Sequence, residues 1–563
     1  MTDPILSIRN LTVEIPTRHG LFTPVRDVSY DIYPGEIRGV VGESGAGKSM
    51  TGNAVIGLLD DPARIASGEI WLKGRRIDHL SVQEQRAIRG REIGMIFQDP
   101  LTSLNPLFTI GEQLVETIQL HLNVSAKVAK ERALALLDRV SIPDPKVRFD
   151  QYPHQFSGGM RQRVVIALAL CSEPSVIIAD EPTTALDVSI QAQVLDLIKE
   201  LACETQVGVI LVTHDMGVIA DTTKKVTVMY NGQVVENGTT DQVLSAPRHD
   251  YTKSLILAVP RPQTKLRRFP QISYDSRETN FKIEDLARDW TKVEKSKSGK
   301  LLEVQGISKQ FLEKSSLIPS WRKYFTAVNN VSLDINDGEV FGLVGESGSG
   351  KSTVARMIGT LLDVDSGRVL FDGDDVTSMA SAELADYRRQ IQMIFQDPFS
   401  SLNPRMKVES IVAEPLLHHK ILPRDRVSVR VEELLDRVGL TRAAAAKYPH
   451  EFSGGQRQRI SIARALATQP RFLICDEPTS ALDVSIQAQI LNILKDLQEH
   501  LGLTMLFISH DLPVVRQMCD RVGVMKQGQL VEVQGTETLF TNPQQDYTKK
   551  LLTLMPRLAQ LSG

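Results

Sequence analysis

The sequence predicts two tandem α/β domains, each built on a largely parallel sheet that carries a phosphate-binding loop. The first observation is a repeat: GESGAGKS at 42–49 returns as GESGSGKS at 345–352. The second observation is the position of each copy: it follows a short apolar segment and precedes helical sequence, as a phosphate loop does between a strand and a helix. The third is a set of continuous apolar runs, which are typical of strands buried on both faces of a parallel sheet.

The repeat covers nearly the whole chain. Lys48 and Lys351 lie 303 positions apart, Gln98 and Gln396 lie 298 apart, and the motifs from FSGG onward lie 296 apart. A repeat this long is a domain, because solenoid units run to roughly 20–50 residues. For 563 residues we expect domains at 1–262 and 301–563, joined by a linker at 263–300. The further repeated motifs are FQDPLTSLNP (97–106) and FQDPFSSLNP (395–404), FSGGMRQR (156–163) and FSGGQRQR (452–459), DEPTTALDVSIQAQ (180–193) and DEPTSALDVSIQAQ (476–489), and THD (213–215) and SHD (509–511).

The hydrophobic pattern predicts the elements of each domain in order. In the first domain the segments up to residue 96 predict strands, a helix that starts at the phosphate loop, and a small antiparallel sheet. The region 107–172 is rich in helical periodicity, and later apolar runs predict parallel strands and a hairpin around Asn231-Gly232. The predicted strands are 5–15, 25–32, 37–41, 175–180, 207–213 and the hairpin 225–235, with helices at 48–59 and 126–140; the second domain repeats the early strands at 301–304, 328–335 and 340–344.

Composition excludes several classes of protein. The hydrophobic share of 42% and charged share of 24% are typical of globular proteins, and a net charge of −3 argues against a nucleic-acid partner. The four cysteines lack CxxC spacing, which favours reduced thiols in a cytoplasmic protein. We expect no signal peptide, because Asp3 and Pro4 interrupt the N-terminus, and no membrane-spanning helix, because no apolar run approaches 18 residues.

The linker contains two features of interest. Its basic cluster, Lys265, Arg267 and Arg268, suits contact with anionic lipid or another subunit, or is simply solvated. A short amphipathic helix is the second expectation, because apolar residues recur there at near-helical spacing. Those residues are Ile283, Leu286, Trp290 and Val293.

The glycine-rich loops carry the first chemistry. Glycines let the backbone wind tightly so that its N–H groups point at phosphate oxygens, and the helix N-terminus adds positive potential. Lys48 and Lys351 are expected to reach the β- and γ-phosphates, and Ser49 and Ser352 to bind Mg²⁺. The nucleotide-contacting residues predicted in the two loops are Gly42, Glu43, Ser44, Gly45, Ala46, Gly47, Lys48, Ser49 and Met50, and Gly345, Glu346, Ser347, Gly348, Ser349, Gly350, Lys351, Ser352 and Thr353.

Two further motifs complete the pattern. Each domain has an apolar strand that ends in two carboxylates, Asp180-Glu181 and Asp476-Glu477. The aspartate suits Mg²⁺ and the glutamate suits deprotonation of a water in line with the γ-phosphate. The FSGG motifs supply a hydroxyl, flexible backbone and a helix N-terminus, the components of a second anion site.

Taken together, these motifs resemble the ATP-binding cassette of ABC transporters, twice over. The resemblance implies two P-loop NTPase cassettes, each with a RecA-like core, an antiparallel β subdomain and a helical signature subdomain. It also implies head-to-tail pairing, in which one cassette's phosphate loop and the other's signature hold each ATP. Site one would use Lys48, Ser49, Gln98, Asp180, Glu181 and His214, closed by Ser453, Gly454, Gly455 and Gln456; site two would use Lys351, Ser352, Gln396, Asp476, Glu477 and His510, closed by Ser157, Gly158, Gly159 and Met160.

The resemblance assigns roles within these sites. Glu181, Glu477, His214, His510, Gln98 and Gln396 are the implied catalytic residues, with ATP and Mg²⁺ bound; the metal would be held by Ser49, Gln98, Asp180, Ser352, Gln396 and Asp476. Phe311 matches the family's adenine-stacking aromatic residue. The first domain has Ile15 there, with Phe22 as a weaker candidate, and Leu168 stands where the second domain has Arg464.

A narrower resemblance is to the ATPase subunits of oligopeptide, dipeptide and nickel importers. It rests on FQDPxxSLNP, on KYPHEFSGGQRQR at 447–459, and on the tails HDYTKSLILAVPRP and QDYTKKLLTLMPRL. It implies a bacterial importer for oligopeptides or dipeptides, with two membrane permease subunits, an external solute-binding protein, and a location at the cytoplasmic face of the inner membrane. Nickel, glutathione-like peptides, modified peptides and sugars remain alternative cargoes.

Two other classes of tandem-cassette ATPase fit less well. Those that act on ribosomes have a long charged helical linker and no SLNP segment, and DNA-repair ATPases have zinc-binding CxxC pairs or long heptad insertions. For a transporter, the segments 105–156 and 403–452 are expected to receive the permeases. The apolar residues expected to line that groove are Leu104, Leu107, Phe108, Leu402 and Met406.

Overall fold

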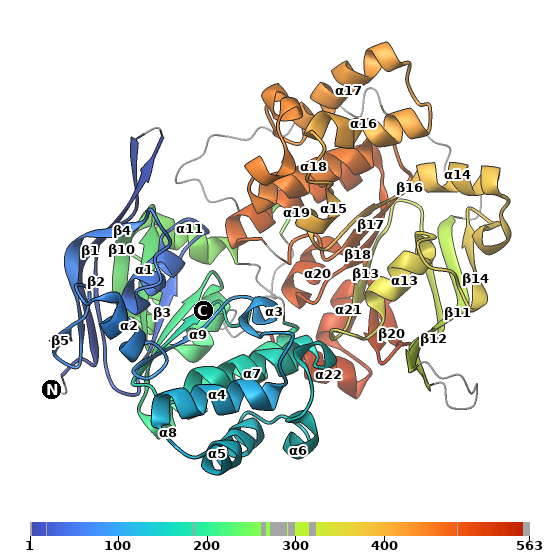
Figure 1. The fold of residues 1–563 in the computed structure, drawn as a ribbon. Helices are drawn as coiled ribbons and strands as arrows, with labels where there is room; N and C mark the ends of the chain where they lie inside the picture. The colour runs from blue at the N-terminus through green and yellow to red at the C-terminus, as the bar shows by residue number, and fades with distance from the viewer. Residues whose placement is uncertain are drawn as a thin grey trace. The chain divides into compact units, whose positions relative to one another are not determined.

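A computed structural model describes residues 3–18, 20–183, 186–259, 266–270, 290, 299–314, 323–480 and 482–555. The chain divides into two compact units. The first is formed by residues up to Val259 and the second by residues from Pro260 to Met555. Each unit is described by itself (Figure 1).

The first unit is built on a six-stranded sheet in the order β10-β9-β3-β8-β7-β6. All neighbouring strands run parallel except the β9–β10 hairpin. Every residue of β3, β7 and β8 is buried, which confirms the prediction from the continuous apolar runs. The strands are β3 (Ile37–Val41), β6 (Ile93–Ile96), β7 (Val176–Asp180), β8 (Gly208–Thr213), β9 (Lys225–Tyr230) and β10 (Gln233–Thr239).

A second, antiparallel sheet of the first unit has the order β2-β1-β4-β5. It contains β1 (Leu6–Thr17), β2 (Gly20–Ile32), β4 (Arg64–Leu72) and β5 (Arg75–Arg76). The expected small antiparallel sheet is therefore present, but the strand at 93–96 pairs in parallel with β7 instead of joining it. A segment of only four residues, Ile93–Ile96, does not reveal which of two sheets it will join.

Helices surround these sheets. Helix α1 begins at Lys48, directly after the phosphate loop, and ends at Ile56 because Gly57 adopts a left-handed conformation (φ 71°). The predicted helix-rich region 107–172 is confirmed. The helices of the first unit are α1 (Lys48–Ile56), α2 (Val82–Ile88), α3 (Pro100–Ser103), α4 (Ile110–Leu122), α5 (Ala126–Arg139), α6 (Pro145–Arg148), α7 (Gly158–Leu170), α8 (Val188–Thr205), α9 (Met216–Thr222), α10 (Thr240–Ser245) and α11 (Asp250–Ala258).

The second unit repeats this architecture. Its six-stranded sheet has the order β16-β17-β18-β13-β19-β20, and its four-stranded sheet the order β12-β11-β14-β15. The strands are β11 (Lys300–Lys314), β12 (Lys323–Asn336), β13 (Val340–Val344), β14 (Ser366–Phe371), β15 (Asp374–Asp375), β16 (Ile391–Ile394), β17 (Phe472–Asp476), β18 (Thr504–Ile508), β19 (Arg521–Lys526) and β20 (Gln529–Gly535). The helices are α13 (Lys351–Ile358), α14 (Ser381–Gln390), α15 (Pro398–Ser401), α16 (Val408–His418), α17 (Arg424–Arg437), α18 (Gly454–Leu466), α19 (Val484–Leu501), α20 (Leu512–Met518), α21 (Thr536–Thr541) and α22 (Asp546–Thr553).

Both units therefore have the predicted α/β fold, in which the phosphate loop joins a central parallel strand to a helix. The predicted hairpin is confirmed as well, with Asn231 (φ 47°) and Gly232 (φ 82°) both left-handed between β9 and β10. The predicted helix around 283–293 lies outside the described residues, apart from Trp290, which packs against the core of the second unit. Among the described helices, none combines the length and the apolar character needed to cross a membrane.

Candidate functional site

The phosphate loops of the two units have the same internal geometry. Lys48 is buried, and its Nζ donates to the carbonyl oxygens of Gly42 and Glu43 at 2.7 and 2.9 Å. Lys351 donates to Gly345 and Glu346 at 2.8 and 2.9 Å. Each lysine is thus held within its own loop, with its ammonium group at the N-terminus of α1 or α13.

Glycine is required where the loop turns into the helix. Gly47 has φ 92°, and a Cβ there would lie 2.5 Å from the carbonyl oxygen of Pro24. Gly350 has φ 100°, and its Cβ would lie 2.4 Å from the carbonyl oxygen of Ala327. Both the backbone conformation and the close approach of β2 or β12 exclude a larger residue.

The serine that follows each lysine contacts the carboxylate at the end of the neighbouring acidic strand. Ser49 Oγ donates to Asp180 Oδ1 at 2.9 Å, and Ser352 Oγ donates to Asp476 Oδ1 at 2.9 Å. Burial raises the pKa of Asp180 and of Asp476, an effect that the serine hydrogen bonds and the nearby lysines oppose. Each unit therefore brings a hydroxyl and a carboxylate together beside the phosphate loop.

The next residue of each acidic strand gathers the predicted glutamine and histidine. Gln98 Nε2 donates to Glu181 Oε2 at 3.0 Å, and His214 Nδ1 lies 3.1 Å from Glu181 Oε1. In the second unit Gln396 and His510 contact Glu477 Oε2 at 2.9 and 3.1 Å. Residues more than 80 positions apart in sequence meet here because β6, β7 and β8 are adjacent parallel strands whose C-terminal ends share one edge.

The two glutamates also share an unusual backbone conformation. Glu181 and Glu477 each have φ 46°, in the left-handed region that glutamate rarely adopts. The backbone N–H of Glu181 donates to Val212 and that of Glu477 donates to Ile508, so the last strand residues remain paired. Such a conformation at the end of a buried strand fixes the direction of a side chain, a use that recurs at functional sites.

Electrostatics in the second unit favour an ionised glutamate. Burial by itself raises the pKa of Glu477, but the hydrogen bond and charge of His510, the charge of Lys351 and the hydrogen bond from Gln396 outweigh it, so the net pKa is lowered. Burial lowers the pKa of His510, but the Glu477 carboxylate outweighs burial and raises it. The pair therefore stabilises an imidazolium beside a carboxylate.

The FSGG serines cap the helices that follow them. Ser157 Oγ accepts from Met160 N at 3.3 Å at the start of α7, and Ser453 Oγ accepts from Gln456 N at 3.4 Å at the start of α18. Gln456 Oε1 also accepts from Ser453 N, which completes a capping box that Met160 cannot form. Both serines are exposed, so each unit has a helix N-terminus that solvent can reach, and such a terminus can bind an anion.

The remaining predicted contacts differ between the units. Phe311, on β11, is 39% exposed and lies opposite Phe325 of β12. Ile15, on β1, lies opposite Phe22 of β2, which is 53% exposed. Arg464 donates to the Ser401 carbonyl at 2.7 Å and so links α18 to α15, whereas Leu168 packs against the core of the first unit.

Sequence reasoning missed one pair of residues beside the phosphate loops. The hydroxyl of Tyr251, on α11, accepts from the Glu43 backbone N–H at 3.0 Å, and that of Tyr547, on α22, accepts from Glu346 N at 3.3 Å. Tyr251 is completely buried. The signal was available, because DYTK occurs in both tails, but it lies some 200 residues from each loop.

The prediction of which apolar residues are exposed to line a permease groove is partly wrong. Leu107 is 79% exposed and Phe108 is 47% exposed, as expected, but Leu104 and Leu402 are 2% and 1% exposed and belong to the cores. Met406 is partly buried against the core of the second unit. Leu101 and Phe399, 62% and 64% exposed, are the apolar residues that α3 and α15 present instead.

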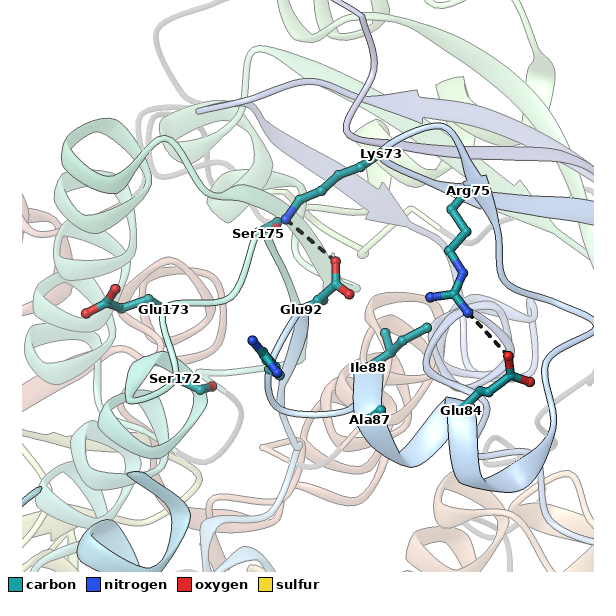
Figure 2. Close-up of a pocket in the computed structure, with 10 residues that line it drawn as sticks. Lys73, Arg75, Glu84, Ala87, Ile88, Glu92, Ser172, Glu173 and Ser175 are labelled. Carbon is teal, nitrogen blue, oxygen red and sulfur yellow. Dashed lines mark hydrogen bonds and ion pairs between the residues drawn. The ribbon is translucent and has the colours of Figure 1, made fainter. Parts of the chain in front are cut away.

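A pocket of about 460 Å³ in the first unit contains none of the predicted site residues. Figure 2 shows two ion pairs in its lining: Lys73 lies 3.6 Å from Glu92, and Arg75 lies 3.4 Å from Glu84. We assign this pocket no role, since these opposite charges pair with each other.

Comparisons with known proteins agree with this geometry. The model of the ABC transporter family matches residues 25–184 and 328–480, and that of the oligopeptide/dipeptide transporter C-terminal region matches 235–281 and 531–563. The chain is 46% identical over 563 residues to the glutathione import ATP-binding protein GsiA of Salmonella typhimurium strain LT2, covering 98% of this chain and 89% of that protein. It is 45% identical over 561 residues to GsiA of Escherichia coli strain K12, with the same coverage.

Among solved structures, the chain is similar to the dimeric post-hydrolysis state of an ATP-binding cassette bound to ADP and Pi. The two sequences are 31% identical, and the match covers 42% of this chain and 99% of that one, with a TM-score of 0.38. The two phosphate loops, the two acidic strand ends and the family matches lead to one conclusion: this chain belongs to the ABC transporter family, as an ATPase with two ATP-binding cassettes in tandem.

Proposed function

We propose that this chain hydrolyses ATP at two composite sites to drive import of glutathione or short peptides through a separate membrane permease. The observation that carries the proposal is the constellation present in both units: a glutamate at a strand end, contacted by a glutamine and a histidine, beside a phosphate loop. Because neither unit lacks a member, both sites are competent.

Each group has a chemical task. Lys48 and Lys351 neutralise phosphate charge, and Glu181 and Glu477 orient a water in line with the γ-phosphate and accept its proton. The depressed pKa of Glu477 keeps it ionised at neutral pH, as a base must be. His214 and His510 hold these carboxylates in place, and Gln98 and Gln396 link them to the segments that lead to α3 and α15.

The residues present fit a magnesium ion. Mg²⁺ takes oxygen ligands, and each unit places a serine hydroxyl and an aspartate carboxylate in direct contact beside the loop. Ser49 and Asp180 would hold one ion, Ser352 and Asp476 the other, with Gln98 and Gln396 nearby. The ion supplies charge neutralisation at the β- and γ-phosphates when bound.

Head-to-tail pairing completes each site in this proposal. The signature segment 453–456 closes the site built on Lys48, and 157–160 closes the site built on Lys351. The exposed serine-capped helix N-termini support this role, since a helix N-terminus stabilises an anion. Phe311 stacks on adenine in the second site, and Phe22 is the candidate in the first.

Cargo and partners follow from the relatives. The two relatives described above are named for glutathione import, and glutathione is a short modified peptide, consistent with the peptide-transporter C-terminal regions. We propose two permease subunits, an external solute-binding protein and a position at the cytoplasmic face of the inner membrane. Nickel, other modified peptides and sugars are the competing cargoes.

Transport assays with the reconstituted complex test which cargo is imported. The chain would be copurified with its permeases in proteoliposomes, with the solute-binding protein outside, and uptake of labelled glutathione, a dipeptide, an oligopeptide and Ni²⁺ compared. We expect ATP-dependent uptake of glutathione or a short peptide, and none with Glu181→Gln/Glu477→Gln. Uptake of Ni²⁺ alone would overturn the peptide assignment.

The same double variant, Glu181→Gln/Glu477→Gln, tests whether the two glutamates act as general bases. Removing both carboxylates leaves the phosphate loops intact, so we expect ATP binding to persist while turnover falls by about 10²-fold or more. Binding is followed with a fluorescent ATP analogue and turnover by phosphate release. Wild-type turnover in the double variant would overturn the role of both glutamates.

A further inference from the structure

Residues 266–270 of the segment between the two cassettes lie against the second unit, on helices α19 and α20. Phe269 is 3% exposed and belongs to the core of that unit. The family match for the C-terminal region of the first cassette extends from 235 to 281 and so includes these residues. A segment that belongs by family to the first cassette therefore has Phe269 buried in the core of the second unit.

The side chain of Arg268 makes a two-pronged contact with α19. Its two terminal nitrogens donate to Glu499 Oε1 and Oε2, each at 2.7 Å, and one also donates to Asp496 Oδ1 at 2.7 Å. A bidentate guanidinium–carboxylate pair is stronger and more specific than a single ion pair. The basic cluster predicted to contact lipid or to be solvated is thus engaged, at Arg268, by the chain itself.

Buried side chains of the second unit bind the backbone of the segment. Asn492, 5% exposed, accepts from Phe269 N at 2.9 Å and donates to Phe269 O at 3.0 Å. Gln517 of α20, 1% exposed, accepts from Leu266 N at 2.6 Å. Lys495 Nζ donates to Leu266 O at 2.8 Å. Without the segment, the amides of Asn492 and Gln517 would lose these partners, at a cost of about 1–3 kcal/mol each if they stayed buried.

The first cassette has no equivalent set of residues. At the positions that correspond to Asn492, Glu499 and Gln517 it has Asp196, Cys203 and Asp221. An ionised aspartate accepts hydrogen bonds but cannot donate one to a backbone carbonyl, and cysteine offers no charge to a guanidinium. Asn492, Glu499 and Gln517 are therefore specific to the second half of the chain, whereas Lys495 and Asp496 correspond to Lys199 and Glu200.

We propose that the second cassette carries a docking site for the segment that follows the first cassette, and that docking acts as a short tether that favours pairing of the two cassettes. The second part of the proposal rests on the head-to-tail pairing proposed above. The docking site recognises a basic–aromatic peptide, Leu-Arg-Arg-Phe, through its backbone, a guanidinium group and a phenyl ring.

The length of the tether determines how strongly docking raises the effective concentration of one cassette near the other. With residues 260–299 undocked, about 41 residue steps, roughly 140 Å of extended chain, would separate Val259 from Lys300. Docking leaves about 7 steps, roughly 25 Å, between Val259 and Leu266. Effective concentration falls as about the −3/2 power of tether length, so docking raises it roughly tenfold.

Limited proteolysis of the full chain tests docking without relying on ATP hydrolysis. Trypsin cleaves after Arg267 and Arg268, and the buried Phe269 blocks access when the segment is docked. We compare Asn492→Asp, which is isosteric and puts aspartate where the first cassette has Asp196, and Glu499→Gln, at a side chain that is 37% exposed. Both leave the cleaved sequence intact, and Asp196→Asn is the matched control.

Cleavage after Arg267 and Arg268, quantified by mass spectrometry against cleavage elsewhere in the chain, is expected to be at least about fivefold faster in Asn492→Asp and Glu499→Gln. The control is expected to match wild type. Wild-type cleavage rates in both variants would overturn the docking site, even if transport and ATPase activity behave as proposed.

The tether is tested by ATPase kinetics of the same proteins. A roughly tenfold lower effective concentration is expected to raise the ATP concentration for half-maximal turnover several-fold while leaving the maximal rate near wild type. Faster cleavage with an unchanged half-saturating ATP concentration would overturn the role in pairing and retain the docking site. An inactive wild-type chain would overturn the proposed function while the cleavage result stands.

Discussion

At the scale of single residues, the two ATP sites depend on atoms that the primary motifs do not include. Tyr251 and Tyr547 come from the last described helix of each unit, and each accepts a hydrogen bond from the amide of the second residue of the phosphate loop, Glu43 or Glu346. Their hydroxyls replace water at a backbone N–H that must not shift if the loop is to keep its shape. The tail region is thereby linked to the nucleotide site of its own cassette.

Replacing Tyr251 and Tyr547 with phenylalanine removes only these hydroxyls. We expect the Michaelis constant for ATP to rise about fivefold, the equivalent of one hydrogen bond of about 1 kcal/mol, with kcat nearly unchanged. Tyr387→Phe is the matched control, since it removes a buried hydrogen bond to Ile358 away from the loop and should lower stability alone. An unchanged Michaelis constant in the double variant would show that the contact has no bearing on ATP.

The pair His510–Glu477 makes the stability of the nucleotide-free second unit depend on pH. The raised histidine pKa contributes stability that is complete below the pKa of an unfolded histidine and is lost as pH rises through the folded value. The lowered pKa of Glu477 contributes stability that is lost as pH falls through the folded value. Wild type should therefore exceed His510→Ala in stability most between about pH 4.5 and 6.5.

Chemical unfolding of both proteins across pH checks this expectation. The difference in unfolding free energy between wild type and His510→Ala should shrink above neutral pH and again in acid. A difference that stays constant from pH 5 to pH 9 would mean that the histidine contributes through packing instead of charge.

At the scale of elements, the segments that follow the short helices α3 and α15 contain apolar residues that look equivalent in sequence but differ in burial. Both helices begin with an aspartate cap and proline, Asp99-Pro100 and Asp397-Pro398, and are only four residues long. The leucine that follows each helix turns inward and is buried, whereas Leu107 is left at the surface. Apolar character alone did not distinguish the two environments.

This difference supplies a matched pair of variants. Leu107→Glu should leave basal ATPase activity of the chain intact and uncouple it from transport in the reconstituted complex, because the side chain is exposed in the segment proposed to contact the permease. Leu104→Glu should instead destabilise the first unit by about 3 kcal/mol or more, because it buries a carboxylate. Thermal unfolding, ATPase assays and uptake separate these outcomes, and full coupling in Leu107→Glu would place the permease contact elsewhere.

At the scale of the whole molecule, composite sites predict effects that cross from one half to the other. Ser453→Arg should cripple hydrolysis at the site built on Lys48, and Ser157→Arg that at the site built on Lys351. In a Lys351→Ala background only the first site binds tightly, so azido-ATP should label both the Lys48 loop and the segment around Ser453. Label confined to the first half would contradict head-to-tail pairing.

Much of the architecture was predictable because it is encoded locally. Phosphate loops, Asn231-Gly232 and continuous apolar strands each need only neighbouring residues to define their conformation, and all were found as predicted. The predicted antiparallel sheet was drawn to residue 96, but the strand at 93–96 pairs in parallel with β7, because hydrogen-bonding partners are chosen by residues far away in sequence. The same limit explains the burial of Leu104 and Leu402.

The sequence by itself determined the family, the two nucleotide-binding motifs and the residue types of the sites, because a repeated set of spaced motifs can be read without coordinates. Only the tertiary structure decided which groups touch: that Glu181 and Glu477 adopt a left-handed conformation, that tail tyrosines support the phosphate loops, and that Arg268 and Phe269 belong to the second unit. The physical reason is that the contacts of the tail tyrosines and of Arg268 join residues from about 200 to more than 230 positions apart. Their free energy depends on the geometry of the packed sheets and helices, which no local pattern specifies.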